Sequence, residues 1–205
     1  SRITGEPIYP GIVWQDRRTT KICSQLKLEG HEEKVKQKTG LVLDPYFSAT
    51  KIQWILDNVK GARKKANKGE LMFGTVDSYL IYKLTKEKKH LTDVTNASRT
   101  LLFNIHGMEW DEDLMNLFNI PMSMMPEVKD CDSEFGTLSI SDTEIPIKGV
   151  IGDQQAALVG QNCFKDGDMK STDGTGCFLM VNTTQNIISV DEGLLTTVAY
   201  KINNQ

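Results

Sequence analysis

The sequence has 205 residues, a formal net charge of −3 and 39% hydrophobic residues. A chain of this length can bury a substantial core, as one large domain or two small ones, so we expect a folded protein. The near-balance of charges gives no reason to expect a surface for nucleic acid. The longest unbroken apolar run, Cys177–Val181, is far shorter than the run of about 20 residues that spans a membrane, so no membrane partner is expected.

The first residues, Ser1–Tyr9, lack the charged start and apolar middle of a signal peptide, which predicts a cytoplasmic protein. Motifs of the zinc-ribbon, CxxC and HExxH types are absent. We therefore expect no disulfide and no protein-held metal, and thiols that are reduced and pack as small hydrophobes. The four cysteines are Cys23, Cys131, Cys163 and Cys177.

The first helix expected along the chain carries Ile22 and Leu26 and stops at Gly30, with Asp16 or Thr19 as its cap. A clearer helix follows the turn at Asp44-Pro45. Ser48 is its expected cap and Gly61 its stop. Its apolar residues recur at i, i+3, i+4 and i+7, which places one face in the core; they are Ile52, Ile55, Leu56 and Val59. The basic residues that follow, within 60–68, are interpreted as a solvent-exposed face.

Further along, Glu70–Phe73 is a short strand candidate, and Thr75–Leu84 is expected to be a helix. That helix places Val76, Leu80 and Leu84 on one face. Leu101–Ile105 looks extended. Another helix is capped by Asp111 and closed by Pro121.

From residue 135 the pattern changes to short extended runs separated by Gly, Asp and Asn turns, with one helix at 154–160. The first half is thus helix-rich and the second half strand-rich. No internal repeat is present. The expected extended runs cover 145–151, 168–172, 177–183, 187–190 and 194–202.

The segment 150–160 is the most informative for chemistry, because an apolar strand ends in Gly152 and Asp153 follows where a small-residue helix begins. In open α/β folds ligands collect at the carboxyl ends of strands, so this carboxylate can reach one. The alternative is that Asp153 is simply the N-cap of the helix. Position alone does not decide between the two.

A second segment, 171–178, places Gly174, Thr175 and Gly176 between two extended runs. Glycines beside a threonine let backbone N–H groups and a hydroxyl face an anion, as in a phosphate-binding nest. The same residues also make an ordinary hairpin turn. The full P-loop and dinucleotide-binding patterns are both missing.

Three aromatic residues, Trp14, Tyr46 and Phe178, suit the wall of a polyol pocket, since they can pack on C–H faces while hydroxyl groups find polar partners. The alternative is that each lies at the boundary of the core.

Several segments together resemble the FGGY carbohydrate kinases, and in particular the members that phosphorylate glycerol. The similarity runs from about Pro7 to Ala199. The matching segments, in order, are IVWQDRRT at 12–19, GLVLDPYFSATK at 40–51, FGTVDSYLIYKLT at 73–85, TDVTNASRTLLFNI at 92–105 and GDQQAALVGQ at 152–161.

The resemblance implies an α/β fold of the actin-like, ribonuclease-H-like ATPase type, in which two domains close on a cleft. Residues 1–160 would form the later part of the N-terminal, polyol-binding domain. Residues 161–205 would begin the C-terminal, nucleotide-binding domain. The chain would then be an internal fragment, unable to turn over by itself.

Carried over residue by residue, the resemblance makes Asp153 the catalytic base and a substrate contact. Gln154 and Tyr46 match polyol contacts, and Trp14 and Phe178 match the apolar wall. In the same way, Gly174 and Thr175 match the turn that contacts the nucleotide phosphates.

The implied reaction is ATP-dependent phosphorylation of glycerol, with ATP and Mg²⁺ as cofactors and a homo-oligomer as the full-length protein. A kinase for another polyol or a pentulose is an alternative. A non-catalytic polyol-binding protein on the same fold is another. Asp173 departs from the family, which often has a tyrosine there, and the segment 136–144 is shorter than in members with an effector loop.

Overall fold

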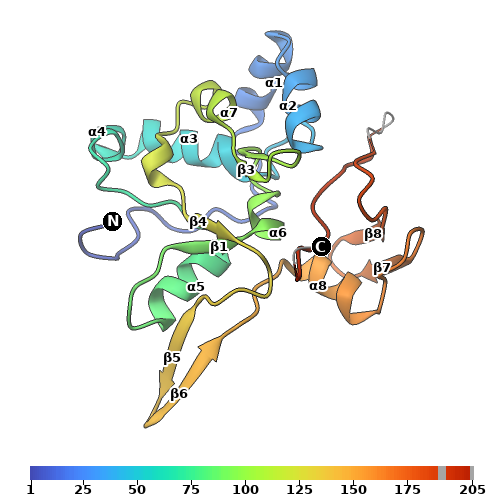
Figure 1. The fold of residues 1–205 in the computed structure, drawn as a ribbon. Helices are drawn as coiled ribbons and strands as arrows, with labels where there is room; N and C mark the ends of the chain where they lie inside the picture. The colour runs from blue at the N-terminus through green and yellow to red at the C-terminus, as the bar shows by residue number, and fades with distance from the viewer. Residues whose placement is uncertain (189–192, 204–205) are drawn as a thin grey trace.

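The computed structural model describes residues 1–188 and 193–203 and is a mixed α/β structure (Figure 1). Its α-helices are α1 (Thr20–Leu28), α2 (Glu32–Thr39), α3 (Ser48–Asn58), α4 (Ala62–Asn67), α5 (Val76–Leu84), α6 (Val94–Ala97), α7 (Glu112–Leu117) and α8 (Asp153–Gly160), and a 3-10 helix covers Met122–Met124. The strands are β1 (Leu91–Asp93), β2 (Phe103–Asn104), β3 (Glu109–Trp110), β4 (Glu127–Lys129), β5 (Gly136–Ile140), β6 (Thr143–Ile147), β7 (Met169–Asp173) and β8 (Cys177–Val181).

The main core lies among α1, α2, α3, α4 and α7 (Figure 1). Each of these helices contributes at least one buried apolar side chain, and burial of apolar surface is the main favourable contribution to folding. The packing is tight enough that several large side chains are fully inaccessible to solvent. They include Val35, Leu41, Leu102, Leu114 and Phe118.

The strands of the described residues form four two-stranded sheets. β1 pairs in parallel with β4, with Thr92 opposite Val128, and α6 follows β1 directly. β2 pairs with β3, β5 with β6 and β7 with β8, each antiparallel. The β5–β6 hairpin extends away from the rest of the molecule, while α8 and the β7–β8 hairpin lie together on one side (Figure 1).

The predicted helices are confirmed at α1, α3, α5, α7 and α8. Two details of α3 are wrong: Phe47 rather than Ser48 is its N-cap, and Gly61 opens α4 instead of stopping α3. Thr19 is the N-cap of α1, but its hydroxyl contacts Thr50 and does not cap the helix. The helices α2 and α4 were not predicted. Both are short and largely polar, so they lack the apolar period that signals a helix.

The three apolar residues that share one face of α5 do not pack into the core of the described residues. Val76, Leu80 and Leu84 are 76%, 47% and 44% exposed, whereas Ser78 and Ile81 are buried. An apolar period shows which side chains share one face of a helix. It does not show what covers that face.

Among the expected extended runs, β7 and β8 confirm 168–172 and 177–183, and β6 covers only the first part of 145–151. No strand forms over 70–73 or over 194–202. These segments make isolated backbone hydrogen bonds, such as Phe73 N–H to the Met124 carbonyl and Thr196 N–H to the Gly40 carbonyl, but no continuous ladder. The run 187–190 lies partly outside the described residues. None of the helices among the described residues is long and apolar enough to cross a membrane.

Three of the cysteines, Cys23, Cys131 and Cys163, are buried as predicted, and Cys177 is exposed, contrary to the expectation that it packs in the core. All four are free thiols. Burial raises the pKa of the Cys131 thiol to about 12, which keeps it protonated and unreactive near neutral pH.

Asp111 connects the helical core to β2 and is 8% exposed. As predicted, its carboxylate caps α7 by accepting the Leu114 N–H at 3.0 Å, and it also accepts from Lys38 Nζ at 2.8 Å. Burial acts to raise the pKa of Asp111, but the hydrogen bonds from Lys38, Asn104 and Leu114 outweigh it and hold this pKa below its usual value.

Because the folded protein holds the pKa of Asp111 low, its carboxylate stabilises the fold above the unfolded pKa of about 3.9, and this contribution is lost as the pH falls through the folded pKa. Asp111→Asn keeps a capping side chain but removes the charge that faces Lys38. We expect it to lower the free energy of unfolding by about 1–2 kcal/mol at pH 7, and by less below about pH 4.

The measurement is urea unfolding at both pH values, with Glu144→Gln as the control, since its ion pair with Lys86 is exposed on both sides. An equal loss at pH 7 and at low pH would show that the Asp111 charge makes no contribution.

Candidate active site

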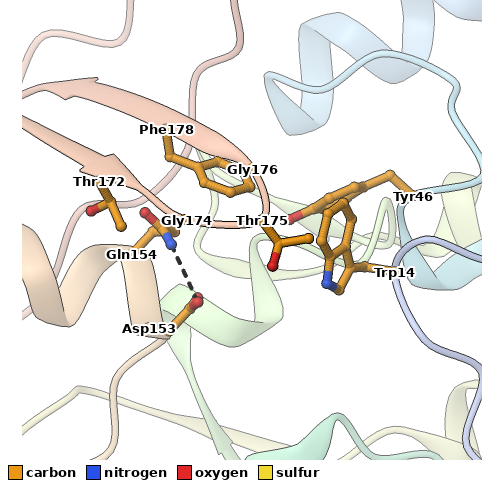
Figure 2. Close-up of a pocket in the computed structure, with 9 residues that line it drawn as sticks. All are labelled: Trp14, Tyr46, Asp153, Gln154, Thr172, Gly174, Thr175, Gly176 and Phe178. Atoms are coloured by element: carbon orange, nitrogen blue, oxygen red, sulfur yellow. Dashed lines mark hydrogen bonds between the residues drawn. The ribbon is translucent and has the colours of Figure 1, made fainter.

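Asp153 is the first residue of α8, and Gly152 is the N-cap, so the alternative that Asp153 caps this helix is wrong. The segment before it, 148–152, is not in a regular strand. The Asp153 side chain is exposed. Its one hydrogen bond among the described residues comes from Gln154 Nε2 to Oδ2, at 3.3 Å (Figure 2). The carboxylate therefore keeps lone pairs available to accept a proton from a ligand.

The start of α8 is anchored to the β1–α6 junction. The Gly152 N–H donates to Thr95 Oγ1 at 2.7 Å, and that hydroxyl donates to Asp93 Oδ2 at 2.6 Å. Asp93 is fully buried at the N-cap of α6. A Cβ at Gly152 would lie 2.8 Å from Gln155 Oε1, so glycine permits this close approach. These contacts fix the position from which Asp153 projects.

The turn 174–176 joins β7 to β8, which confirms that the glycines form a hairpin turn. Phe178 packs back against this turn, since a Cβ at Gly176 would lie 2.9 Å from Phe178 Cε2. Thr175 is exposed at the tip. The backbone conformation of a hairpin does not exclude a role in binding phosphate, because the turn still presents N–H groups and a hydroxyl.

The aromatic side of the site is built from two distant segments. The rings of Trp14 and Tyr46 lie 5.6 Å apart at 53°, and Tyr46 contacts Phe47 edge to face at 5.0 Å. Trp14 is 41% exposed and is not among the side chains packed against the main core, whereas Tyr46 is. Tyr46 and Phe178 are half-buried. Their exposed edges face the hairpin turn (Figure 2).

All seven site residues that were predicted line one cavity of about 280 Å³ (Figure 2). Trp14 and Tyr46 lie on one side and Asp153 and Gln154 on another, with Thr175 between them. The cavity is lined by Trp14, Tyr46, Asp153, Gln154, Thr172, Gly174, Thr175, Gly176 and Phe178. Sequence reasoning missed Thr172, although it belongs to the segment 171–178, and considered Gly176 only as part of the candidate phosphate-binding turn.

Two cations next to the cavity were also missed. The Arg99 guanidinium lies 5.2 Å from the centre of the Phe47 ring, near Tyr46. Burial lowers the pKa of Arg99, while Tyr46 and the charge of Asp153 act in the opposite direction. Lys170, on β7, is 2% exposed and lies behind Gln154. Both cations favour an anionic ligand or an ionised carboxylate in the cavity.

The cavity thus combines one carboxylate, an amide, an aromatic wall and a glycine-rich turn. Asp153 is the one carboxylate among the lining residues. No group of three or more His, Cys, Asp and Glu side chains within the described residues could hold a metal ion. Such a site can bind a small polyhydroxylated molecule and accept a proton from it.

Comparison with known proteins agrees with this geometry. Residues 2–160 match the family model described as "FGGY family of carbohydrate kinases, N-terminal domain". The chain belongs to the FGGY family of carbohydrate kinases. It is 57% identical over 206 residues to a glycerol kinase of Rhodopseudomonas palustris, covering 100% of this chain and 41% of that protein. The chain thus spans less than half the length of this relative.

Solved structures of the same family confirm the actin-like ATPase fold. A Plasmodium falciparum glycerol kinase crystallised with ADP superposes with a TM-score of 0.93 at 41% identity, over 98% of this chain and 40% of that one. A xylulose kinase from Rhodospirillum rubrum gives a TM-score of 0.73 at 20% identity, over 85% of this chain and 36% of that one. The second likeness concerns the fold alone.

Proposed function

We propose that the full-length protein containing this chain transfers the terminal phosphoryl group of ATP to glycerol, with Asp153 as the general base. The observation that carries the proposal is the single cavity that collects seven residues from four distant segments. The 57% identity to a glycerol kinase and the superposition on a glycerol kinase crystallised with ADP support the choice of glycerol and of a nucleotide.

In this reaction a primary hydroxyl oxygen of glycerol bonds to the terminal phosphorus of ATP, the bond to the ADP oxygen breaks, and Asp153 accepts the hydroxyl proton. Gln154 and Tyr46 hold glycerol hydroxyls, while Trp14 and Phe178 pack on its C–H faces. Phosphoryl transfer leaves a protein mainly the tasks of positioning and charge stabilisation. One aligned carboxylate and fixed polar groups suit those tasks.

The turn with Gly174 and Thr175 is proposed to contact the nucleotide phosphates through backbone N–H groups and the hydroxyl. Mg²⁺ would be held mostly by nucleotide oxygens and water, since the cavity offers it one carboxylate. When bound, the ion neutralises phosphate charge. Asp173 is exposed at the end of β7 and is not among the residues that line the cavity.

The organisation of the chain is part of the proposal. Residues 1–160 form the later part of the N-terminal domain, and residues 161–205 begin the nucleotide-binding domain. The protein acts in the cytoplasm as a homo-oligomer. Since the chain spans 41% of the length of a 57% identical relative, we expect it to be inactive alone.

The test is ADP release by the full-length protein with ATP, Mg²⁺ and a panel of glycerol, pentuloses and other polyols. We expect glycerol to give the highest kcat/KM. A pentulose that is turned over substantially faster would replace glycerol as the substrate. An absence of ADP release with every compound of the panel would favour a non-catalytic polyol-binding protein.

Tyr46→Ala should mainly raise the KM for glycerol, because the ring packs against Trp14 and lines the cavity. We expect a rise of about 10-fold or more, with a smaller change in kcat. Tyr46→Phe keeps the ring and should have an intermediate effect. Tyr79→Ala, at an exposed tyrosine on α5, is the control. An unchanged KM in Tyr46→Ala would limit Tyr46 to packing.

A further inference from the structure

Lys170 is a buried cation directly behind the cavity. Its side chain is 2% exposed, and it does not line the cavity itself. Lys170 Nζ donates to Gln154 Oε1 at 2.5 Å and to Thr172 Oγ1 at 2.8 Å. Both acceptors belong to residues that line the cavity. The ammonium group therefore holds two lining side chains without lining the cavity itself.

This contact settles the orientation of the Gln154 side chain. A carboxamide has one accepting oxygen and one donating NH₂ group, whereas an ammonium group can only donate. The oxygen of Gln154 must therefore face Lys170, and a flipped amide would bring two donors together. Gln154 Nε2 is left to donate to Asp153 Oδ2, at 3.3 Å. The buried Lys170 is thus linked to the candidate base, Asp153, through the side-chain amide of Gln154.

Stability does not explain a lysine at this position. Lysine is almost never fully buried unless it is paired, and the two groups bonded to Lys170 are neutral oxygens. Burial lowers the pKa of Lys170, and the charge of Asp153 acts against that effect. A methionine of similar length would avoid the cost of burying a charge. The charge is therefore better explained by its effect on the site.

We propose that Lys170 is a positioning residue, which holds the Gln154 amide so that it presents only N–H donors to Asp153 and to the bound polyol. The proposal rests on the proposed function. A substrate group next to Gln154 must then be an acceptor, such as a hydroxyl oxygen. The Asp153 carboxylate is held through Oδ2, which leaves Oδ1 for the proton.

The experiment compares Lys170→Met, Gln154→Ala and the double variant in the full-length protein, with glycerol and ATP varied separately. We expect Lys170→Met to fold with an unchanged melting temperature and to lose about 10- to 100-fold in kcat/KM for glycerol, while the KM for ATP changes little. If Lys170 acts through Gln154, adding Lys170→Met to Gln154→Ala should cause almost no further loss. Lys165→Met, at an exposed lysine, is the matched control.

Normal glycerol kinetics in Lys170→Met would overturn the inference, and so would fully additive losses in the double variant. A loss of activity that follows a fall in melting temperature would also overturn it, because Lys170 would then act on the fold. These outcomes differ from a failure of the proposed function, in which the unmodified protein itself shows no glycerol-dependent ADP release.

Discussion

Replacing Asp153 with asparagine in the full-length protein is expected to lower kcat by about 100-fold or more, because an amide cannot accept the hydroxyl proton. Asparagine has nearly the same shape, so glycerol binding should stay within a few-fold. Asp153 is exposed and is not the cap of α8, so its replacement has little reason to disturb the fold.

The measurement is steady-state ADP release together with calorimetric binding of glycerol. Asp166→Asn, at an exposed aspartate of the neighbouring segment, is the matched control and should behave as the unmodified protein. Near-normal turnover in Asp153→Asn would remove Asp153 from the role of base. A large loss of glycerol binding would show instead that Asp153 mainly holds the substrate.

The second large effect is expected at Asp93, which is fully buried. Its Oδ2 accepts from the Thr95 N–H, the Thr95 hydroxyl and the Cys131 thiol, at 2.9, 2.6 and 3.3 Å. Its Oδ1 accepts from the Asn96 N–H and side-chain amide, at 3.1 and 2.7 Å. We expect Asp93→Ala to lower the free energy of unfolding by about 3 kcal/mol or more, because it leaves several buried donors unpaired.

Asp93→Asn separates shape from hydrogen bonding. It keeps the volume but turns an NH₂ group toward donors on one side, so it should also destabilise the protein, though less than Asp93→Ala. Both variants should lower turnover as well, since Thr95 connects Asp93 to the start of α8. Urea unfolding checks the stability, with Asp142→Ala, in the exposed β5–β6 turn, as the control. Unfolding midpoints unchanged in both Asp93 variants would contradict this account of the junction.

The candidate site was predictable because the resemblance identified residues in separate segments. Hydrophobic periodicity located α3, but it cannot show that the side chains of the site meet; they include Trp14, Tyr46, Asp153 and Phe178. The position of Asp153 after a glycine was equally compatible with an N-cap. Only the folded arrangement shows that Gly152 is the cap and that the carboxylate faces the cavity.

Other features could not be predicted from the sequence, for physical reasons. Lys170 alternates with Met169 and Ser171 along β7, and a lysine in such a strand is normally taken as exposed. The helix α2 carries only Val35 and Thr39 as buried residues, so its apolar period is too weak to detect. Residues 148–151 include the apolar pair Val150 and Ile151 but have no paired strand, and strand formation depends on the partner.

The measurement that tests the account most directly is a crystal structure of the full-length protein with glycerol. The glycerol concentration is kept near its KM, and a different compound serves as cryoprotectant. We predict that glycerol lies in the cavity between Trp14 and Gln154. A terminal hydroxyl oxygen should lie about 2.6–3.2 Å from an Asp153 carboxylate oxygen. Glycerol bound elsewhere, with Asp153 turned away from every hydroxyl group, would contradict the assignment of both the site and the base.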